Sequence, residues 1–258
     1  MLIDVAGAGI HCRFDGAAGA PVLVLSNSLG ADLAMWDAQV PELARTFRVL
    51  RYDTRGHGAS TVAPGPYAID LLGRDVVGLL DGLGIERAHF CGLSLGGMTG
   101  MWLGVHARPR LHRLVLANTA ARVGSPETYN ARIDKVRASG MGAVSQAVLE
   151  RWFTPAFAAK DPDRVADMRR MIERTPVEGY AACCTAIRDM DQRDAVAAIS
   201  APTLVITGTH DLATPAADGR FIAERIKGST CVELDAAHLS NIEAAPAFTA
   251  ALLAFLDT

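Results

Sequence analysis

Hydrophobic positions along the chain fall into two patterns. Short, strongly apolar runs that are typical of strands occur at residues 10–14, 21–26, 47–52, 88–91 and 111–118. Longer stretches with apolar residues at helical spacing lie between them, at residues 36–43, 67–83 and 98–106. Because the run at 21–26 is almost continuously apolar, we expect it to be buried on both faces. The alternation predicts an α/β fold with a mostly parallel central sheet flanked by helices.

The alternation stops between residues 122 and 191, where no strand pattern occurs. Helices are predicted there at residues 130–138, 143–152, 162–173 and 178–190. An interruption of roughly 70 residues is too long for a plain connection between two core elements. We therefore predict that residues 122–191 form an inserted helical cap, or lid. Residues 1–121 and 192–258 form the predicted core, with further strands at 203–207 and 230–234 and helices at 221–227 and 246–256.

One serine lies between glycines, at the junction of a predicted strand and a predicted helix. Residues 92–96 have the sequence Gly-Leu-Ser-Leu-Gly, which is the G-x-S-x-G pattern of a nucleophile elbow on a strained turn. Gly92 and Gly96 lack the Cβ atoms that would keep the backbones of strand and helix apart. Ser94 is therefore the predicted nucleophile, and we expect the cap to lie over it.

The acid and base that such a serine needs are found downstream. For a serine on an elbow they follow in the order Ser…Asp…His, and His238 is the histidine that comes after the candidate acids. Asp211 lies just past the predicted strand at 203–207, at the edge of the sheet where ligand sites form. The competing acids lie beside the last cap helix or lack a strand that ends at them. In the predicted triad, His238 takes the proton of Ser94 and Asp211 holds the imidazole.

Two backbone N–H groups are candidates for an oxyanion hole. Leu29 lies in the loop after residues 21–26, where Gly30 lets the backbone bend, and Leu95 directly follows the nucleophile. We predict that the N–H groups of Leu29 and Leu95 are the donors, with an ordinary polar turn at 27–30 as the alternative. The charged side chains of residues 53–57 lie in another glycine-rich loop, and we assign them a structural role.

Composition and charge argue against several classes of protein. The formal net charge is −3 and no basic run occurs, so the footprint of a nucleic-acid-binding protein is missing. No stretch reaches the about 18 apolar residues of a membrane-spanning helix and no leader is found, so we expect no membrane partner and a cytoplasmic location. The five cysteines are scattered, which predicts reduced core thiols without disulfides or zinc. No metal or cofactor motif is found, so no cofactor is expected, and the sequence does not indicate the oligomeric state.

Several segments together resemble the α/β-hydrolase family and, within it, the 3-oxoadipate enol-lactonases. They lie at residues 26–30, 51–58, 92–98, 117–120, 151–155, 179–184 and 238–243. The resemblance covers the whole chain and implies a serine hydrolase that opens a small carboxylated enol-lactone to 3-oxoadipate in aromatic catabolism.

Two departures from this resemblance bear on the substrate. Asn27 and Ser28 stand where many members of the family have His-Gly, and no tryptophan follows His238, unlike in the carbon–carbon bond hydrolases of ring-cleavage products. The rival interpretations are another small-ester or lactone hydrolase, a perhydrolase, or a ligand receptor on the same fold.

An acidic substrate in a mostly apolar pocket needs a cation, because an unpaired buried carboxylate is strongly disfavoured. The predicted cap carries arginines, whose planar guanidinium groups bind carboxylates through two hydrogen bonds, at positions 122, 132, 137, 151 and 188. We choose Arg132, on the first cap helix, with a solvated surface arginine as the alternative. Trp152 is the aromatic residue that we place near the pocket, although such a residue more commonly belongs to a core.

Overall fold

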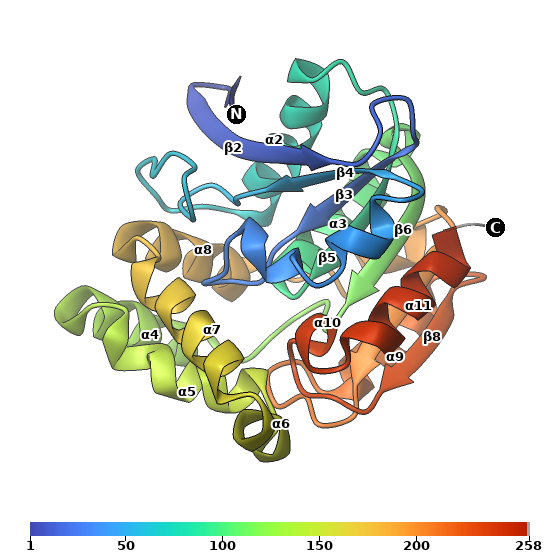
Figure 1. Cartoon of the computed structure of the whole chain (residues 1–258). Coiled ribbons are helices and arrows are strands. Elements are labelled where there is room, and N and C mark those ends of the chain that lie inside the picture. Colours follow the sequence, from blue (N-terminus) through green and yellow to red (C-terminus); the bar gives the residue numbers. More distant parts are fainter. Residues whose placement is uncertain (257–258) are drawn as a thin grey trace.

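The computed structural model describes residues 1–256, which fold around one eight-stranded sheet (Figure 1). Its strands are β1 (Leu2–Val5), β2 (Ala8–Asp15), β3 (Val22–Ser26), β4 (Arg48–Tyr52), β5 (Ala88–Leu93), β6 (Leu111–Ala117), β7 (Thr203–Gly208) and β8 (Thr230–Leu234). Their order across the sheet is β1-β2-β4-β3-β5-β6-β7-β8. All neighbours from β4 to β8 pair in parallel, whereas β2 pairs antiparallel with β1 and β4. The predicted mostly parallel sheet is confirmed.

Helices flank this sheet. They are η1 (Leu33–Trp36), α1 (Val40–Leu43), α2 (Ile69–Gly82), α3 (Leu95–His106), η2 (Arg108–Arg110), η3 (Ala195–Ala198), α9 (Ala216–Arg225), α10 (Ser240–Glu243) and α11 (Ala245–Leu256). The single helix predicted at 36–43 is wrong, because η1 and α1 are separate short elements there. Strand β3 is buried from Leu23 onward, as expected for a parallel strand covered on both faces.

Five short elements within residues 1–256 have no counterpart in the predictions: β1, η2, η3, α10 and, in the insertion between β6 and β7, α6 (Pro155–Lys160). Strand β1 forms an antiparallel hairpin with β2, and the turn between them places Ala6 and Gly7 at φ 50° and 81°. Helix α10 comes directly before α11, where the sequence shows no helical pattern. No helix within residues 1–256 is long and apolar enough to cross a membrane.

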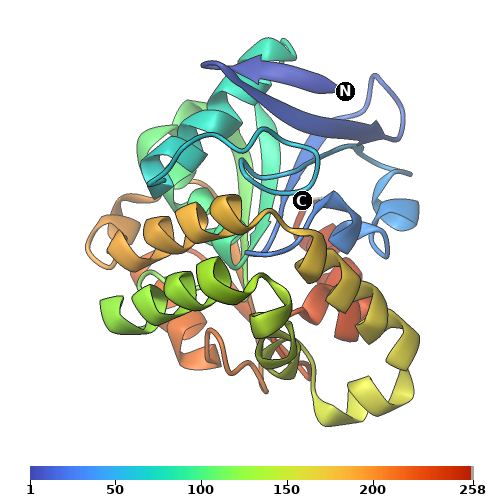
Figure 2. The ribbon, with the colours of Figure 1, turned by 90° about the vertical axis from the view of Figure 1, so that its left-hand side faces the viewer.

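A helical insertion separates β6 from β7. Its helices are α4 (Pro126–Ser139), α5 (Gly142–Trp152), α6 (Pro155–Lys160), α7 (Pro162–Arg174) and α8 (Val177–Asp189). The side chains of Ser125, Thr154 and Asp161 cap the first turns of α4, α6 and α7. Figure 2 shows these helices gathered into one group against the rest of the molecule. The boundaries 122–191 for the cap stay a prediction.

A close backbone contact seats α8 on the core. A Cβ atom at Gly56 would lie 2.6 Å from the Cα atom of Gly179, and a Cβ atom at Gly179 would lie 1.9 Å from the carbonyl oxygen of Gly56. Only glycine fits on both sides of such a contact. Beside it, the Thr175 hydroxyl donates to the carbonyl oxygen of Gly30 at 3.2 Å. The insertion therefore rests directly on the loops that follow β3 and β4.

Candidate active site

Ser94 occupies the turn between β5 and α3. Its backbone has φ 57° and ψ −113°, a strained conformation for a residue with a side chain. A Cβ atom at Gly92 would lie 2.1 Å from the carbonyl oxygen of Gly96, and one at Gly96 would lie 2.3 Å from that of Ser26. Strand, turn and helix thus pass so closely that glycine is required at both positions, in agreement with the elbow predicted from the sequence.

Asp211 and His238 lie in the loops after β7 and β8 and form a buried pair. The distance from His238 Nδ1 to Asp211 Oδ2 is 2.8 Å. The carboxylate also accepts hydrogen bonds from the N–H groups of Ala213 and Thr214, at 2.8 and 2.9 Å, and from the Thr214 hydroxyl and the Asn118 amide, at 2.9 and 3.1 Å.

These donors determine the charge of the pair. Burial by itself would raise the pKa of Asp211, but the charge and hydrogen bond of His238, together with the donors from Thr214 and Asn118, lower this pKa below its ordinary value. An ionised Asp211 holds the proton of the imidazole on Nδ1 and leaves Nε2 as the basic nitrogen. Asn118 was not among the predicted site residues; its φ of 43° marks it as unusual only once the structure is known.

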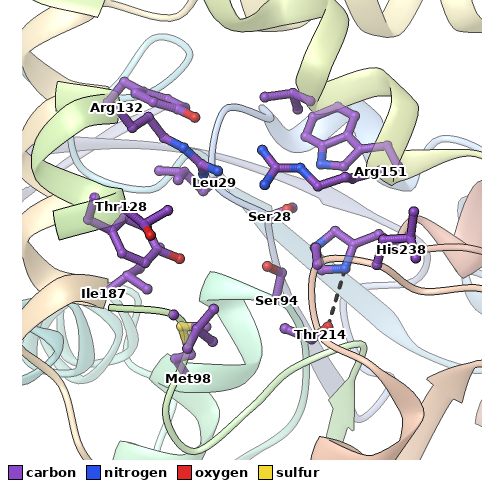
Figure 3. Close-up of a pocket in the computed structure, with 18 residues that line it drawn as sticks. Ser28, Leu29, Ser94, Met98, Thr128, Arg132, Arg151, Ile187, Thr214 and His238 are labelled. Carbon is purple, nitrogen blue, oxygen red and sulfur yellow. Dashed lines mark hydrogen bonds between the residues drawn. The ribbon is translucent and has the colours of Figure 1, made fainter. Parts of the chain in front are cut away.

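Ser94 and His238 face one cavity of about 240 Å³ (Figure 3). Core residues on its wall include Ser28, Leu29 and Met98. The insertion supplies much of the remaining wall, through Tyr129, Arg132, Val148, Arg151, Trp152 and Tyr180. The structure therefore brings the predicted Trp152 and Arg132 to the same cavity as Ser94.

The predicted oxyanion donors flank this cavity. Leu29 lines it, and Leu95 is the first residue of α3, where the N–H group has no acceptor within the helix. The neighbouring Gly30 has φ 82° and donates its N–H to Nε2 of His57 at 3.0 Å. Burial lowers the pKa of His57 to about 4, so its imidazole is neutral and accepts this hydrogen bond. The donor roles of Leu29 and Leu95 stay predictions.

Two arginines of the insertion direct their guanidinium groups into the cavity. Figure 3 shows Arg132 and Arg151 on the side of the cavity opposite Ser94. Within residues 1–256, neither has a carboxylate partner; Arg132 lies over the Tyr129 ring at 5.4 Å, and Arg151 Nε donates to the carbonyl oxygen of Ala147 at 3.2 Å. Burial and the positive charge of Arg132 lower the pKa of Arg151. Such a pair is suited to bind an anion.

The three remaining cap arginines form ion pairs and do not line the cavity. Arg122 pairs with Asp191, Arg137 with Glu178 and Arg188 with Asp189. The guanidinium groups of these three arginines already have carboxylate partners. Of the five candidate arginines, Arg132 and Arg151 line the cavity, and the other three do not.

A model of the family described as the alpha/beta hydrolase fold matches residues 21–245. The chain belongs to the α/β-hydrolase family. Within this family it is 44% identical over 241 residues to 3-oxoadipate enol-lactonase 2 of Acinetobacter baylyi, an alignment that covers 93% of this chain and 90% of that protein. The crystal structure of the enol-lactonase from Burkholderia xenovorans LB400 is 51% identical, with a TM-score of 0.97 over 98% of both chains. The resemblance to the enol-lactonases is confirmed.

A second kind of α/β-hydrolase is also similar. The structure of a thermophilic esterase from Thermogutta terrifontis, with malate bound, is 32% identical to this chain, with a TM-score of 0.92. The match covers 99% of this chain and 96% of the esterase. Solved structures similar to this chain therefore include an esterase as well as an enol-lactonase.

Charged residues in the loop after β4 support the α/β-hydrolase core and do not line its cavity. Arg55 forms a buried bidentate ion pair with Asp75 of α2, in which Nε donates to Oδ2 at 2.7 Å. Asp53 lies 2.8 Å from His11 Nδ1 and accepts hydrogen bonds from two backbone N–H groups. These contacts agree with the structural role predicted for residues 53–57.

Other groups with possible chemistry lie away from the cavity. Four cysteines are buried, but Cys231 is exposed, so the prediction of a core thiol is wrong there: it stands on β8, at the edge of the sheet. Among residues 1–256, no group of three or more His, Cys, Asp or Glu side chains could hold a metal ion.

Proposed function

We propose that this α/β-hydrolase opens 3-oxoadipate enol-lactone to 3-oxoadipate, the reaction for which its enol-lactonase relatives are named. One observation carries the proposal: Ser94 and the buried His238–Asp211 pair face the same small cavity as two arginines that have no carboxylate partner within residues 1–256. The lactone offers an ester carbonyl to a serine nucleophile and a carboxylate to a cation. The location in the cytoplasm stays a prediction.

The proposed reaction has two halves that share the triad. Ser94 Oγ attacks the lactone carbonyl while His238 Nε2 takes its proton, and Asp211 stabilises the imidazolium. The ring C–O bond then breaks, and His238 returns the proton to the departing enol oxygen, whose enol becomes the ketone of the product. Water, deprotonated by His238, then attacks the acyl carbon; the bond from this carbon to Ser94 Oγ breaks, His238 returns the proton to Oγ, and the new carboxylic acid loses its proton to solvent. The N–H groups of Leu29 and Leu95 hold the oxyanion, each contributing about 2.7–4 kcal/mol in comparable sites.

We assign the binding of the substrate carboxylate to Arg132, with Arg151 beside it. Two guanidinium groups that lack carboxylate partners among residues 1–256 give an anion a favourable place, whereas a neutral substrate would leave both cations uncompensated. Trp152 forms part of the apolar wall. In this assignment residues 122–191 act as the lid, since they supply both arginines and the tryptophan.

Turnover tests the proposal against its rivals. The purified protein should convert authentic enol-lactone over many rapid cycles and convert a neutral lactone of the same ring size much more slowly. A general esterase, the rival favoured by the similarity to the malate-bound esterase, would show the opposite preference or none. A single slow turnover accompanied by a change in the cap would indicate a receptor.

A further inference from the structure

Two hydrogen bonds hold the loop that carries His238, one to the insertion and one to helix α10. The Leu239 N–H donates to the carbonyl oxygen of Trp152 at 3.0 Å. On the other side of the histidine, the Ala237 N–H donates to Oε2 of Glu243 at 2.9 Å. Both sequence neighbours of His238 are therefore held in place.

Glu243 extends this connection into the insertion. Its Oε1 accepts a hydrogen bond from the Thr154 hydroxyl, and the Thr154 N–H lies 3.4 and 3.3 Å from the two carboxylate oxygens. Thr154 is also the capping residue of α6, because its hydroxyl oxygen accepts a hydrogen bond from the Phe157 N–H at 3.2 Å. The Glu243 side chain accepts hydrogen bonds from two loops that are far apart in the sequence.

The segment that Glu243 holds also forms the cavity wall. Arg151 and Trp152 line the cavity, and they come just before Thr154 in the chain. A substrate bound to these side chains is thus connected, through Trp152 on one side and Thr154 on the other, to the backbone on either side of His238.

We propose that Glu243 is a positioning residue that fixes the position of His238 relative to Arg151 and Trp152 of the cap. The inference rests on the proposed function. Glu243 is not part of the cavity wall. Arg151 and Trp152 belong to helix α5, whose own backbone hydrogen bonds keep them in place, whereas the Ala237 N–H beside His238 loses its acceptor when Glu243 is removed. The loss of Glu243 therefore displaces the base more than the binding groups, so kcat falls while KM changes little. Misplacement of a catalytic group by about 1 Å can lower a rate by roughly 100-fold.

The test compares four variants. Glu243→Ala removes the whole connection and should lower kcat roughly 10- to 100-fold with less than about a threefold change in KM. Thr154→Val removes the arm toward the cap and should show a smaller loss of kcat, whereas Thr154→Ser keeps the hydroxyl and should restore kcat to near the wild-type value. Glu224→Ala, on the exposed face of α9, is the matched control and should match the wild type.

A second measurement separates positioning from stability. The rate at which a small fluorophosphonate labels Ser94 depends on His238 as base but does not need the substrate carboxylate, so this rate should fall in Glu243→Ala by a factor similar to that for kcat. Wild-type kcat in folded Glu243→Ala, or equal losses in Thr154→Val and Thr154→Ser, would overturn the inference. If Glu243→Ala does not fold, the two Thr154 variants decide. Failure of the proposed function has a different signature, because labelling would then proceed normally while the wild type does not turn over the lactone.

Discussion

His57 and Gly30 are joined by a hydrogen bond in which the Gly30 N–H donates to the imidazole Nε2 at 3.0 Å. The bond requires a neutral ring with its proton on Nδ1, which lies 3.4 Å from the carbonyl oxygen of Arg55. Because Gly30 directly follows Leu29, the buried imidazole helps to fix the backbone of the loop whose Leu29 N–H we assign to the oxyanion hole.

The burial of His57 makes the free energy of unfolding depend on pH. Burial lowers the pKa of His57 from 6.5 to about 4 in the folded protein, so between these values the unfolded chain binds a proton that the folded chain does not. The free energy of unfolding should therefore be highest above pH 6.5 and should fall, by about 3 kcal/mol from this group, as the pH drops to 4. Urea unfolding should show a flatter dependence in His57→Asn. The exposed His210 provides the control, and a wild-type slope in His57→Asn would contradict the assignment.

Loss of the nucleophile or of the base should abolish most of the activity. Ser94→Ala and His238→Ala should each lower kcat for the enol-lactone by roughly 10⁴- to 10⁶-fold, and the double variant should be no worse, because the two residues act as one unit. Absorbance of the enol-lactone follows the reaction directly. Ser139→Ala, at the exposed end of α4, should have wild-type activity. Near-normal turnover by Ser94→Ala would reject Ser94 as the nucleophile.

The two arginines of the cavity should select for charge. Arg132→Ala should cost about 2–5 kcal/mol in kcat/KM for the carboxylated lactone, and far less for a neutral ester, since only the anion loses a partner. Arg151→Ala should act in the same direction. The control is Arg137→Ala, which removes an exposed cap arginine paired with Glu178. Equal losses on both substrates would indicate a packing defect in place of lost recognition.

The elbow should not tolerate a methyl group at Gly96. Because an added Cβ atom would lie 2.3 Å from the carbonyl oxygen of Ser26, Gly96→Ala should lower the free energy of unfolding by about 3 kcal/mol or more. Gly142→Ala is the matched control: no atom lies within 4 Å of its Cβ position, and its effect should stay below about 1 kcal/mol. Thermal unfolding of both variants gives the comparison, and similar values for the two would contradict the close approach seen at the elbow.

Some strands and helices could be predicted from the sequence more easily than others. Strand β3 could be predicted because a strand covered on both faces is apolar along most of its length, which leaves a nearly continuous signal. Strands β5 and β6 contain histidine or arginine near their starts, but their remaining residues are apolar or glycine and buried, which is still a strong signal. Strand β1 has only a weak apolar pattern, since it lies at the edge of the sheet and its Leu2 is 62% exposed. Helix α10 is only four residues long, which is about one helical turn and too short for a periodic pattern.

Some residues of the candidate site could be predicted from the sequence, and others could not. Ser94, Asp211 and His238 could be chosen because the elbow has a local pattern and the other two follow strands in a set order. Which arginines face the cavity could not be read in this way, because Arg132 and Arg151 lie on different helices and converge only when α4 packs against α5. Asn118 and Glu243 lie in segments that carry the family resemblance, at residues 117–120 and 238–243. Their contacts could not be predicted, because the partners, Asp211 and Thr154, are distant in the sequence.

The contact between Gly56 and Gly179 offers a way to alter substrate size without changing any cavity-lining residue. A methyl group at position 179 would have to displace either α8 or the loop after β4, and α8 carries Tyr180 on the cavity wall. Displacement of α8 would move Tyr180 and so change the cavity wall, while Ser94 and His238 stayed on the core. This glycine pair therefore sets the distance between the cap helix that lines the cavity and the core that carries Ser94 and His238.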